Sequence, residues 1–139
     1  MKHSFILLLA AITLATSFTA CKPKQHTDAN NNTIVLRFSL DADGNIVEED
    51  VRQQIAAISK HIDSTSNKMM MYVYTEQTGS TEQNIALGKE LGHAVKQFAQ
   101  DQSERAYYDL GLEVRGYENP IDSLNPASLK NRRIEVRPL

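Results

Sequence analysis

The residues best suited to hold a ligand follow an apolar stretch, Met69–Tyr74. Thr75, Glu76 and Thr78 come directly after it, and Asn84 lies near the start of a segment with helical spacing. A carboxylate among hydroxyl and amide groups can hold a cationic group, and a helix N-terminus adds free N–H groups and positive potential. The pattern predicts a ligand site where a strand passes into a helix. In the alternative interpretation, Glu76 is only a favourable charge at the helix N-terminus.

The sequence shows no pattern that is typical of an enzyme. Glu76 with His93 or a nearby serine is the one combination that could serve a hydrolase, and no nucleophile elbow, metal-ligand spacing or paired-carboxylate signature accompanies it. The turn at 41–45 superficially resembles a calcium loop but does not have the EF-hand spacing. With one cysteine, Cys21, the chain can form neither an intramolecular disulfide nor a Cys-based metal site. We therefore predict a protein without catalytic activity, cofactor or metal.

The bulk composition fits one globular domain. The chain has 139 residues, of which 41% are hydrophobic and 23% are charged, and its formal net charge is -2. Nucleic-acid-binding proteins present a clustered basic face, which this charge balance does not indicate. We therefore predict no nucleic-acid partner.

The N-terminal residues predict export and lipidation. Residues 1–20 combine a short basic start with an apolar run that is too short to span a bilayer comfortably, which is typical of a signal peptide. The ending Phe18–Cys21 resembles a bacterial lipobox, so Cys21 is the expected lipidation site, with acyl chains as the anchor. The alternative is a plain signal peptide that leaves a free thiol. Lys22, in place of aspartate, favours the outer membrane. Residues 21–32 are polar and are expected to form a disordered tether.

Apolar periodicity predicts one α+β domain over residues 33–139. Strands are expected at 33–40, 69–74, 108–115 and 132–137, with 69–74 in the middle of the sheet because it is apolar at nearly every position. Helices are expected after Glu48 and after Ser80, and a polar connection at 100–106. The order β-α-β-α-β-β indicates a two-layer sandwich, with two helices on one face of a four-stranded mixed sheet. Gly88 and Gly92 suggest a close approach between the second helix and a neighbouring element.

Three segments in the same order resemble motifs of one family. Tyr74–Gly79 followed by Asn84 resembles H-T-D-x-x-G…N-x-x-L-S-x-x-R, and Gly116–Pro120 resembles a shortened G-x-G-E-x-x-P loop. Asn131–Val136 matches N-R-R-V-E-I closely. Residues 33–139 are therefore similar to the OmpA-like C-terminal domain, the peptidoglycan-associated module also found in Pal lipoproteins and flagellar stators.

The resemblance implies a site for the peptide stem of peptidoglycan. In the family, an aspartate in the turn and an arginine on the second helix pair with the ammonium and carboxylate groups of diaminopimelate. By position, the aspartate corresponds to Glu76 and the arginine to Leu91, which cannot form a charge-assisted bond. The expected ligand-binding residues are Thr75, Glu76, Thr78, Asn84, Leu91, Asn131, Arg132 and Arg133.

Two functional hypotheses follow. In the first, a lipid-anchored domain facing the periplasm binds peptidoglycan and tethers the outer membrane to the cell wall. Glu76 then holds the ammonium group, and Arg132, Arg133 or Lys89 holds a carboxylate. A change of Leu91 to arginine is expected to strengthen binding if the pocket is otherwise intact. In the second hypothesis, the site is degenerate and the domain is an adaptor that binds another envelope protein.

Overall fold

The computed structural model describes residues 27–28 and 32–139. The elements, in chain order, are β1 (Thr27–Asp28), β2 (Thr33–Leu36), α1 (Glu49–Thr65), β3 (Met69–Tyr74), α2 (Thr81–Gln102), α3 (Glu104–Asp109), β4 (Leu110–Gly116), the 3-10 turn η1 (Leu129–Asn131) and β5 (Arg133–Pro138). Among the described residues, no helix combines the length and the apolar character that crossing a bilayer requires.

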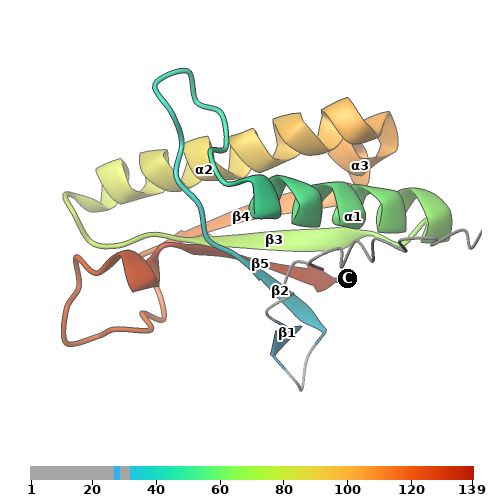
Figure 1. Cartoon of the computed structure of the whole chain (residues 1–139). Coiled ribbons are helices and arrows are strands. Elements are labelled where there is room, and N and C mark those ends of the chain that lie inside the picture. The colour runs from blue at the N-terminus through green and yellow to red at the C-terminus, as the bar shows by residue number, and fades with distance from the viewer. Residues whose placement is uncertain (1–26, 29–31) are drawn as a thin grey trace, which may run out of the picture.

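The sheet has the strand order β1-β2-β5-β3-β4. Strand β5 lies between β2 and β3 and is antiparallel to both, whereas β3 and β4 are parallel. In the described part of the chain, α1, α2 and α3 all lie on the same face of the sheet (Figure 1). This arrangement confirms the predicted two-layer α+β sandwich, in which β3 is an inner strand of the sheet. The short β1 adds a fifth strand beside β2.

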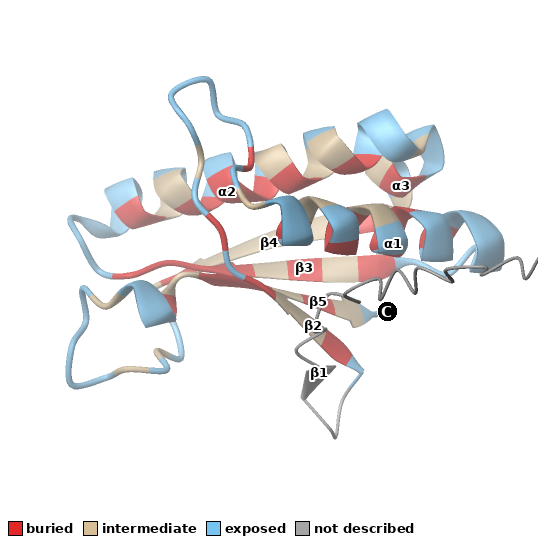
Figure 2. Ribbon diagram, in the orientation of Figure 1, coloured by how far each residue is buried: buried red, intermediate tan, exposed pale blue. Residues whose placement is uncertain are grey.

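The core lies between the helices and the sheet (Figure 2). Strand β3 alternates its side chains, so Met69, Met71 and Val73 face the helices and are buried. They pack against an apolar stripe on each of the two long helices, in one continuous cluster. The stripe of α1 consists of Val51, Ile55, Ile58 and Ile62, and that of α2 includes Leu91, Val95 and Ala99.

The structure differs from the predicted elements at four places. Strand β2 ends at Leu36 instead of residue 40. The segment 100–106, predicted as a polar connection, contains the end of α2 and the start of α3. Helix α3 begins after Ser103, whose side chain accepts a hydrogen bond from the Ala106 N–H at 3.3 Å and so caps the helix. Tyr108 and Asp109 belong to α3 and not to the strand. Within the predicted tether, Thr27–Asp28 pair with β2.

The two glycines of α2 allow the helix to lie close to β4, as predicted. A Cβ atom at residue 88 would lie 2.5 Å from Val114 Cγ1, and one at residue 92 would lie 2.4 Å from Leu112 Cδ1. Both distances are shorter than a van der Waals contact. The side chain of valine is stiff because it branches at Cβ, whereas a leucine methyl group can rotate away.

We therefore expect Gly88→Ala to destabilise the domain and Gly92→Ala to change it less. Overpacking against Val114 should cost about 1–3 kcal/mol, which outweighs the roughly 1 kcal/mol that alanine gains in helix propensity. Urea unfolding of the two variants beside the wild type measures the difference. A Gly88→Ala variant more stable than Gly92→Ala would contradict this packing argument.

Candidate functional site

The turn from β3 into α2 is fixed at both ends. The Thr75 N–H donates to the Gly116 carbonyl at 2.9 Å, and the Gln77 N–H donates to the Pro126 carbonyl at 2.9 Å. At the start of α2, Ser80 and Gln83 form a capping box, each side chain accepting from the backbone N–H of the other. Because Ser80 is the cap, Glu76 does not have the helix-terminal role that was its alternative interpretation.

Glu76 is a buried partner of Arg132. Its residue surface is 1% exposed, and its carboxylate accepts from Arg132 Nε at 2.9 Å and from Arg132 Nη2. Burial acts to raise the pKa of Glu76, but the hydrogen bonds from Arg132, a backbone hydrogen bond and the positive charge of Arg132 together outweigh it and hold the pKa below its usual value. The same pairing raises the pKa of Arg132. Arg132 already neutralises Glu76 in this structure, so an ammonium group would have to compete with Arg132. That Glu76 holds an ammonium group stays a prediction.

Asn131 holds the long loop between β4 and β5. It is fully buried. Its Oδ1 accepts from the Asp122 N–H at 2.8 Å, and its Nδ2 donates to the carbonyls of Asp122, Asn125 and Pro126 at 3.1–3.3 Å. All four contacts are made to the loop backbone. The side chain therefore holds the loop backbone in place, and its contact with a ligand stays a prediction.

Replacement of Asn131 by alanine should loosen this loop. The change removes four hydrogen bonds that hold the loop backbone, so we expect it to cost about 2–3 kcal/mol of unfolding free energy. Urea unfolding measures the cost, and limited proteolysis near the exposed Leu124 reports the loop. Asn125→Ala is the matched control, because Asn125 is exposed and takes part in these hydrogen bonds with its backbone N–H and carbonyl only. Equal stability of the two variants would contradict the proposed role of Asn131.

Arg133 is also used within the fold. Its Nε donates to Glu135 at 2.8 Å, its Nη2 donates to the Asn119 carbonyl at 3.1 Å, and its guanidinium lies 3.9 Å from the centre of the Tyr74 ring. The side chain is buried. Arg133 lies on the face of the sheet opposite α1 and α2 and binds the start of the loop. That it holds a ligand carboxylate stays a prediction.

Leu91 belongs to the core. It is 2% exposed, and it shares a gap with Phe38 and Arg132 that has no room for a water molecule. Its side chain is covered in this structure and shares the lining of one gap with Phe38 and Arg132. The ligand contact of Leu91 stays a prediction.

The remaining predicted residues surround the turn. Thr75 is buried, and its Oγ1 has no hydrogen-bond partner. Asn84 is buried and its Oδ1 accepts from the exposed Thr78 N–H at 3.4 Å, so both belong to the turn. Lys89 is exposed on α2. Cys21, the signal peptide and the tether, apart from Thr27, Asp28 and Asn32, lie outside the described residues.

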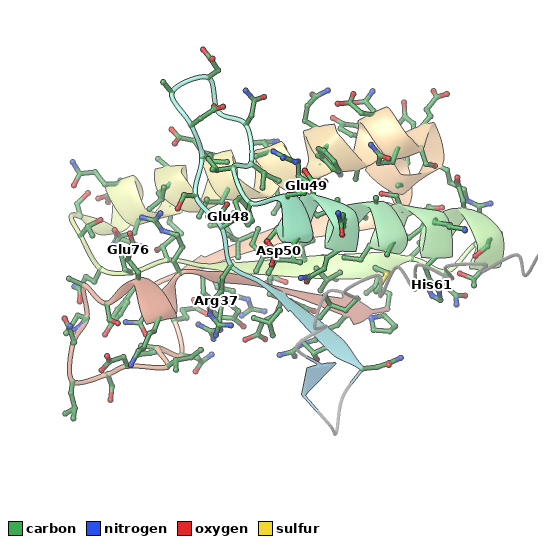
Figure 3. The ribbon with its side chains drawn as sticks, in the orientation of Figure 1. Arg37, Glu48, Glu49, Asp50, His61 and Glu76 are labelled. Carbon is green, nitrogen blue, oxygen red and sulfur yellow. The ribbon has the colours of Figure 1, made fainter. Side chains whose placement is uncertain are left out.

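A cationic hollow lies beside the Glu76–Arg132 pair. It has a volume of about 350 Å³. Arg37 comes from the segment after β2, and Lys130 comes from η1. Figure 3 shows Arg37, Glu48 and Glu76 at one end of the domain, well away from His61. We call this hollow the basic groove. Its lining consists of Arg37, Phe38, Ser39, Glu48, Leu129, Lys130 and Arg132.

Sequence reasoning placed Arg132 in the site but missed Arg37 and Lys130. The alternation of buried Leu36 and Phe38 with Arg37 was a usable signal that Arg37 points outward. Its position near η1 depends on the fold and has no local signal. Among the described residues, no group of three His, Cys, Asp or Glu side chains is placed to hold a metal ion.

Solved structures with the same fold come from bacterial envelope proteins. The OmpA-like domain of FopA1 from Francisella tularensis has a TM-score of 0.61 at 17% identity, covering 77% of this chain and 73% of its own. The peptidoglycan-associated lipoprotein from Burkholderia pseudomallei has a TM-score of 0.61 at 18% identity, covering 76% and 89%. The cell wall anchor of the type VI secretion system from Pseudomonas aeruginosa has a TM-score of 0.55 at 14% identity, covering 75% and 78%.

No protein-family model matches the sequence, and no curated protein matches it either. The likeness is therefore one of structure, and it agrees with the resemblance of the three sequence motifs. The described domain has the OmpA-like fold.

Proposed function

We propose that this chain is a lipid-anchored envelope protein whose OmpA-like domain binds the peptide stem of peptidoglycan non-covalently and so tethers the outer membrane to the cell wall. Cys21 carries the anchor, residues 21–32 form the tether, and the domain faces the periplasm. The solved structures of a peptidoglycan-associated lipoprotein and of a cell wall anchor support this proposal through their common fold with this chain.

One observation carries the proposal: three sequence segments that resemble the family motifs meet at one end of the domain. The Thr75 N–H donates to Gly116, which joins the first segment to the second. Arg132 binds Glu76, which joins the third to the first. Arg133 reaches Asn119, which joins the third to the second. The motifs therefore form one connected unit.

The mode of binding in this chain differs from the one the family resemblance implies. Glu76 is already paired with Arg132, and Leu91 is covered. The ligand's ammonium group must compete with Arg132 for Glu76, which lowers the affinity available there. Because opposite charges attract, the cations around the basic groove favour the carboxylates of the stem peptide. We therefore expect binding to depend on carboxylate contacts and to weaken with added salt.

A second candidate function is that of an adaptor for another envelope protein. Large apolar side chains are exposed on and beside the loop between β4 and β5, and Leu124 is 97% exposed. Exposed apolar side chains held in one place are common in protein interfaces. Asn131 fixes the backbone of this loop, so Leu124 is presented on an ordered segment. These side chains are Ile121, Leu124 and Leu129.

Sedimentation with purified sacculi tests the first function. The full chain in detergent is mixed with sacculi and centrifuged, with and without free diaminopimelate as a competitor. We expect the chain to sediment with the sacculi and the competitor to release it. Leu124→Asp is the matched variant, because it disrupts the apolar loop surface and leaves the motif unit intact. Failure of the wild type to sediment would support the adaptor function instead.

The anchor has its own expected result. Cys21→Ala removes the thiol to which the lipid would be attached. Without the acyl chains, the protein loses the groups that would hold it stably in the membrane. We expect the variant to move from the membrane fraction to the soluble fraction. Immunoblots of fractionated cells measure this. Unchanged fractionation would refute lipidation at Cys21.

A further inference from the structure

The basic groove is formed by two segments that are far apart in the sequence. Leu36 and Phe38 are buried, so the alternation of the extended chain turns Arg37 outward. The 3-10 turn η1 brings Lys130 to the other side of the groove, and Arg132 follows it. The fixed loop and the paired Arg132 therefore hold the second side of the groove in place.

The charges in the groove are unbalanced. Glu48 is its one acidic side chain, and both oxygens of that carboxylate accept from the Ser39 N–H at 3.0 Å. Arg132 is paired with Glu76. In the described part of the chain, Arg37 and Lys130 take part in no ion pair, although most other arginines do. Two cations are thus available for an anionic ligand.

The groove also offers apolar surface. Leu129 is 67% exposed at its edge, and Phe38 forms part of its lining. A volume of about 350 Å³ is within the range of small-ligand sites. The combination suits a ligand that carries carboxylates beside short apolar groups. The stem peptide has this chemistry, with its diaminopimelate carboxylates next to alanine methyl groups.

We infer that the basic groove is the carboxylate-binding subsite for the stem peptide, with Arg37 and Lys130 as the residues that hold the carboxylates. This inference rests on the proposed function. Leu91 lies beneath the groove, in contact with the same gap as Phe38 and Arg132. In this inference, Arg37 and Lys130 take over the role of the helix arginine that the family resemblance implies at position 91. Both side chains approach the ligand from the solvent side.

Binding of a soluble stem peptide tests the inference. The full chain in detergent is titrated calorimetrically with a diaminopimelate-containing tripeptide, once with free carboxylates and once with amidated carboxylates. The variants are Arg37→Gln, Lys130→Gln and the double variant. Lys60→Gln is the matched control, because it removes an exposed cation outside the groove. Lys89→Gln tests the competing site on α2. Thermal unfolding shows whether each variant remains folded, as expected for exposed residues.

We expect the double variant to bind the free acid about tenfold more weakly than the wild type, with about threefold for each single change. Amidation of the peptide should weaken wild-type binding and hardly change binding to the double variant. The Lys60→Gln control should bind like the wild type, and so should Lys89→Gln if the carboxylates lie in the basic groove and not on α2.

The outcomes separate the inference from the function on which it rests. If sacculi and stem peptide bind the double variant as well as the wild type, the groove assignment is overturned and the proposed function stands. A loss caused by Lys89→Gln instead would also overturn it, in favour of a site on α2. If the wild type binds neither sacculi nor stem peptide, the proposed function and the groove assignment both fail.

Discussion

Replacement of Leu91 by arginine is expected to destabilise the domain strongly, without restoring a contact to the ligand. The Leu91 side chain is buried in the core and lies close to Arg132. A guanidinium at this position would lose its hydration and lie beside a like charge. A buried charge without a partner costs about 3–5 kcal/mol, so the variant should be largely unfolded if the domain has ordinary stability.

Urea unfolding of Leu91→Arg measures this cost, and Leu91→Met is its control. Methionine has nearly the volume of leucine, so that change should cost less than about 1.5 kcal/mol. The burial of Leu91 thus argues against the condition on which stronger binding by arginine depended, namely a pocket that stays otherwise intact. A folded Leu91→Arg variant that binds the stem peptide more tightly than the wild type would show that Leu91 is not a core residue.

Loss of Arg132 is expected to cost more than loss of the charge on Glu76. The Glu76 side chain is 2% exposed, whereas that of Arg132 is 24% exposed. Arg132→Ala leaves a carboxylate buried without a partner, at about 3 kcal/mol or more. Glu76→Gln leaves a guanidinium that can still reach water, at about 1–2 kcal/mol. The double change should cost less than the sum of the two single changes.

The pH dependence of stability provides an independent test of this pair. The folded-state pKa of Glu76 lies below its usual value, so the unfolded chain takes up this proton first as the pH falls. The contribution of the pair is therefore complete above the unfolded-state pKa, which is about 4.3. It decreases as the pH falls through that value towards the folded-state pKa. The stability difference between the wild type and Arg132→Ala should be largest near neutral pH and should narrow below about pH 4–5.

Unfolding curves of the wild type, Arg132→Ala and Glu76→Gln at several pH values measure the effect. Glu49→Gln is a suitable control, because Glu49 is an exposed acid whose partner, Arg52, lies on the same helix. Its removal should change stability by less than 1 kcal/mol. A stability difference for Arg132→Ala that stays constant from neutral to acidic pH would rule out the buried carboxylate as its cause.

The arrangement of the main elements could be predicted because each has a strong periodic signal. The apolar spacing of Val51, Ile55, Ile58 and Ile62 specifies α1, and the apolar density of Met69–Tyr74 specifies a central strand. The short helix α3 could not be predicted in this way. It is six residues long and depends on the Ser103 cap and on the burial of Ala106 against other elements.

The positions of the site residues were predicted better than their partners. The turn after β3 and the segment Asn131–Arg133 do meet in the structure. Glu76 and Arg132, however, are 56 residues apart, and a sequence gives no measure of the distance between two such charges. The sequence likewise gives no measure of the distance between Arg37 and Lys130. Their positions beside the same groove depend on how the loop held by Asn131 places η1.

The central position of β5 has a consequence for how the domain folds. It is the last element in chain order, yet it separates β2 from β3. The earlier strands β2, β3 and β4 therefore cannot form a continuous sheet among themselves, and every pairing of β5 with β2 closes a long loop, which slows folding. The complete sheet can therefore form only when the C-terminal strand of the chain is available to join β2 to β3.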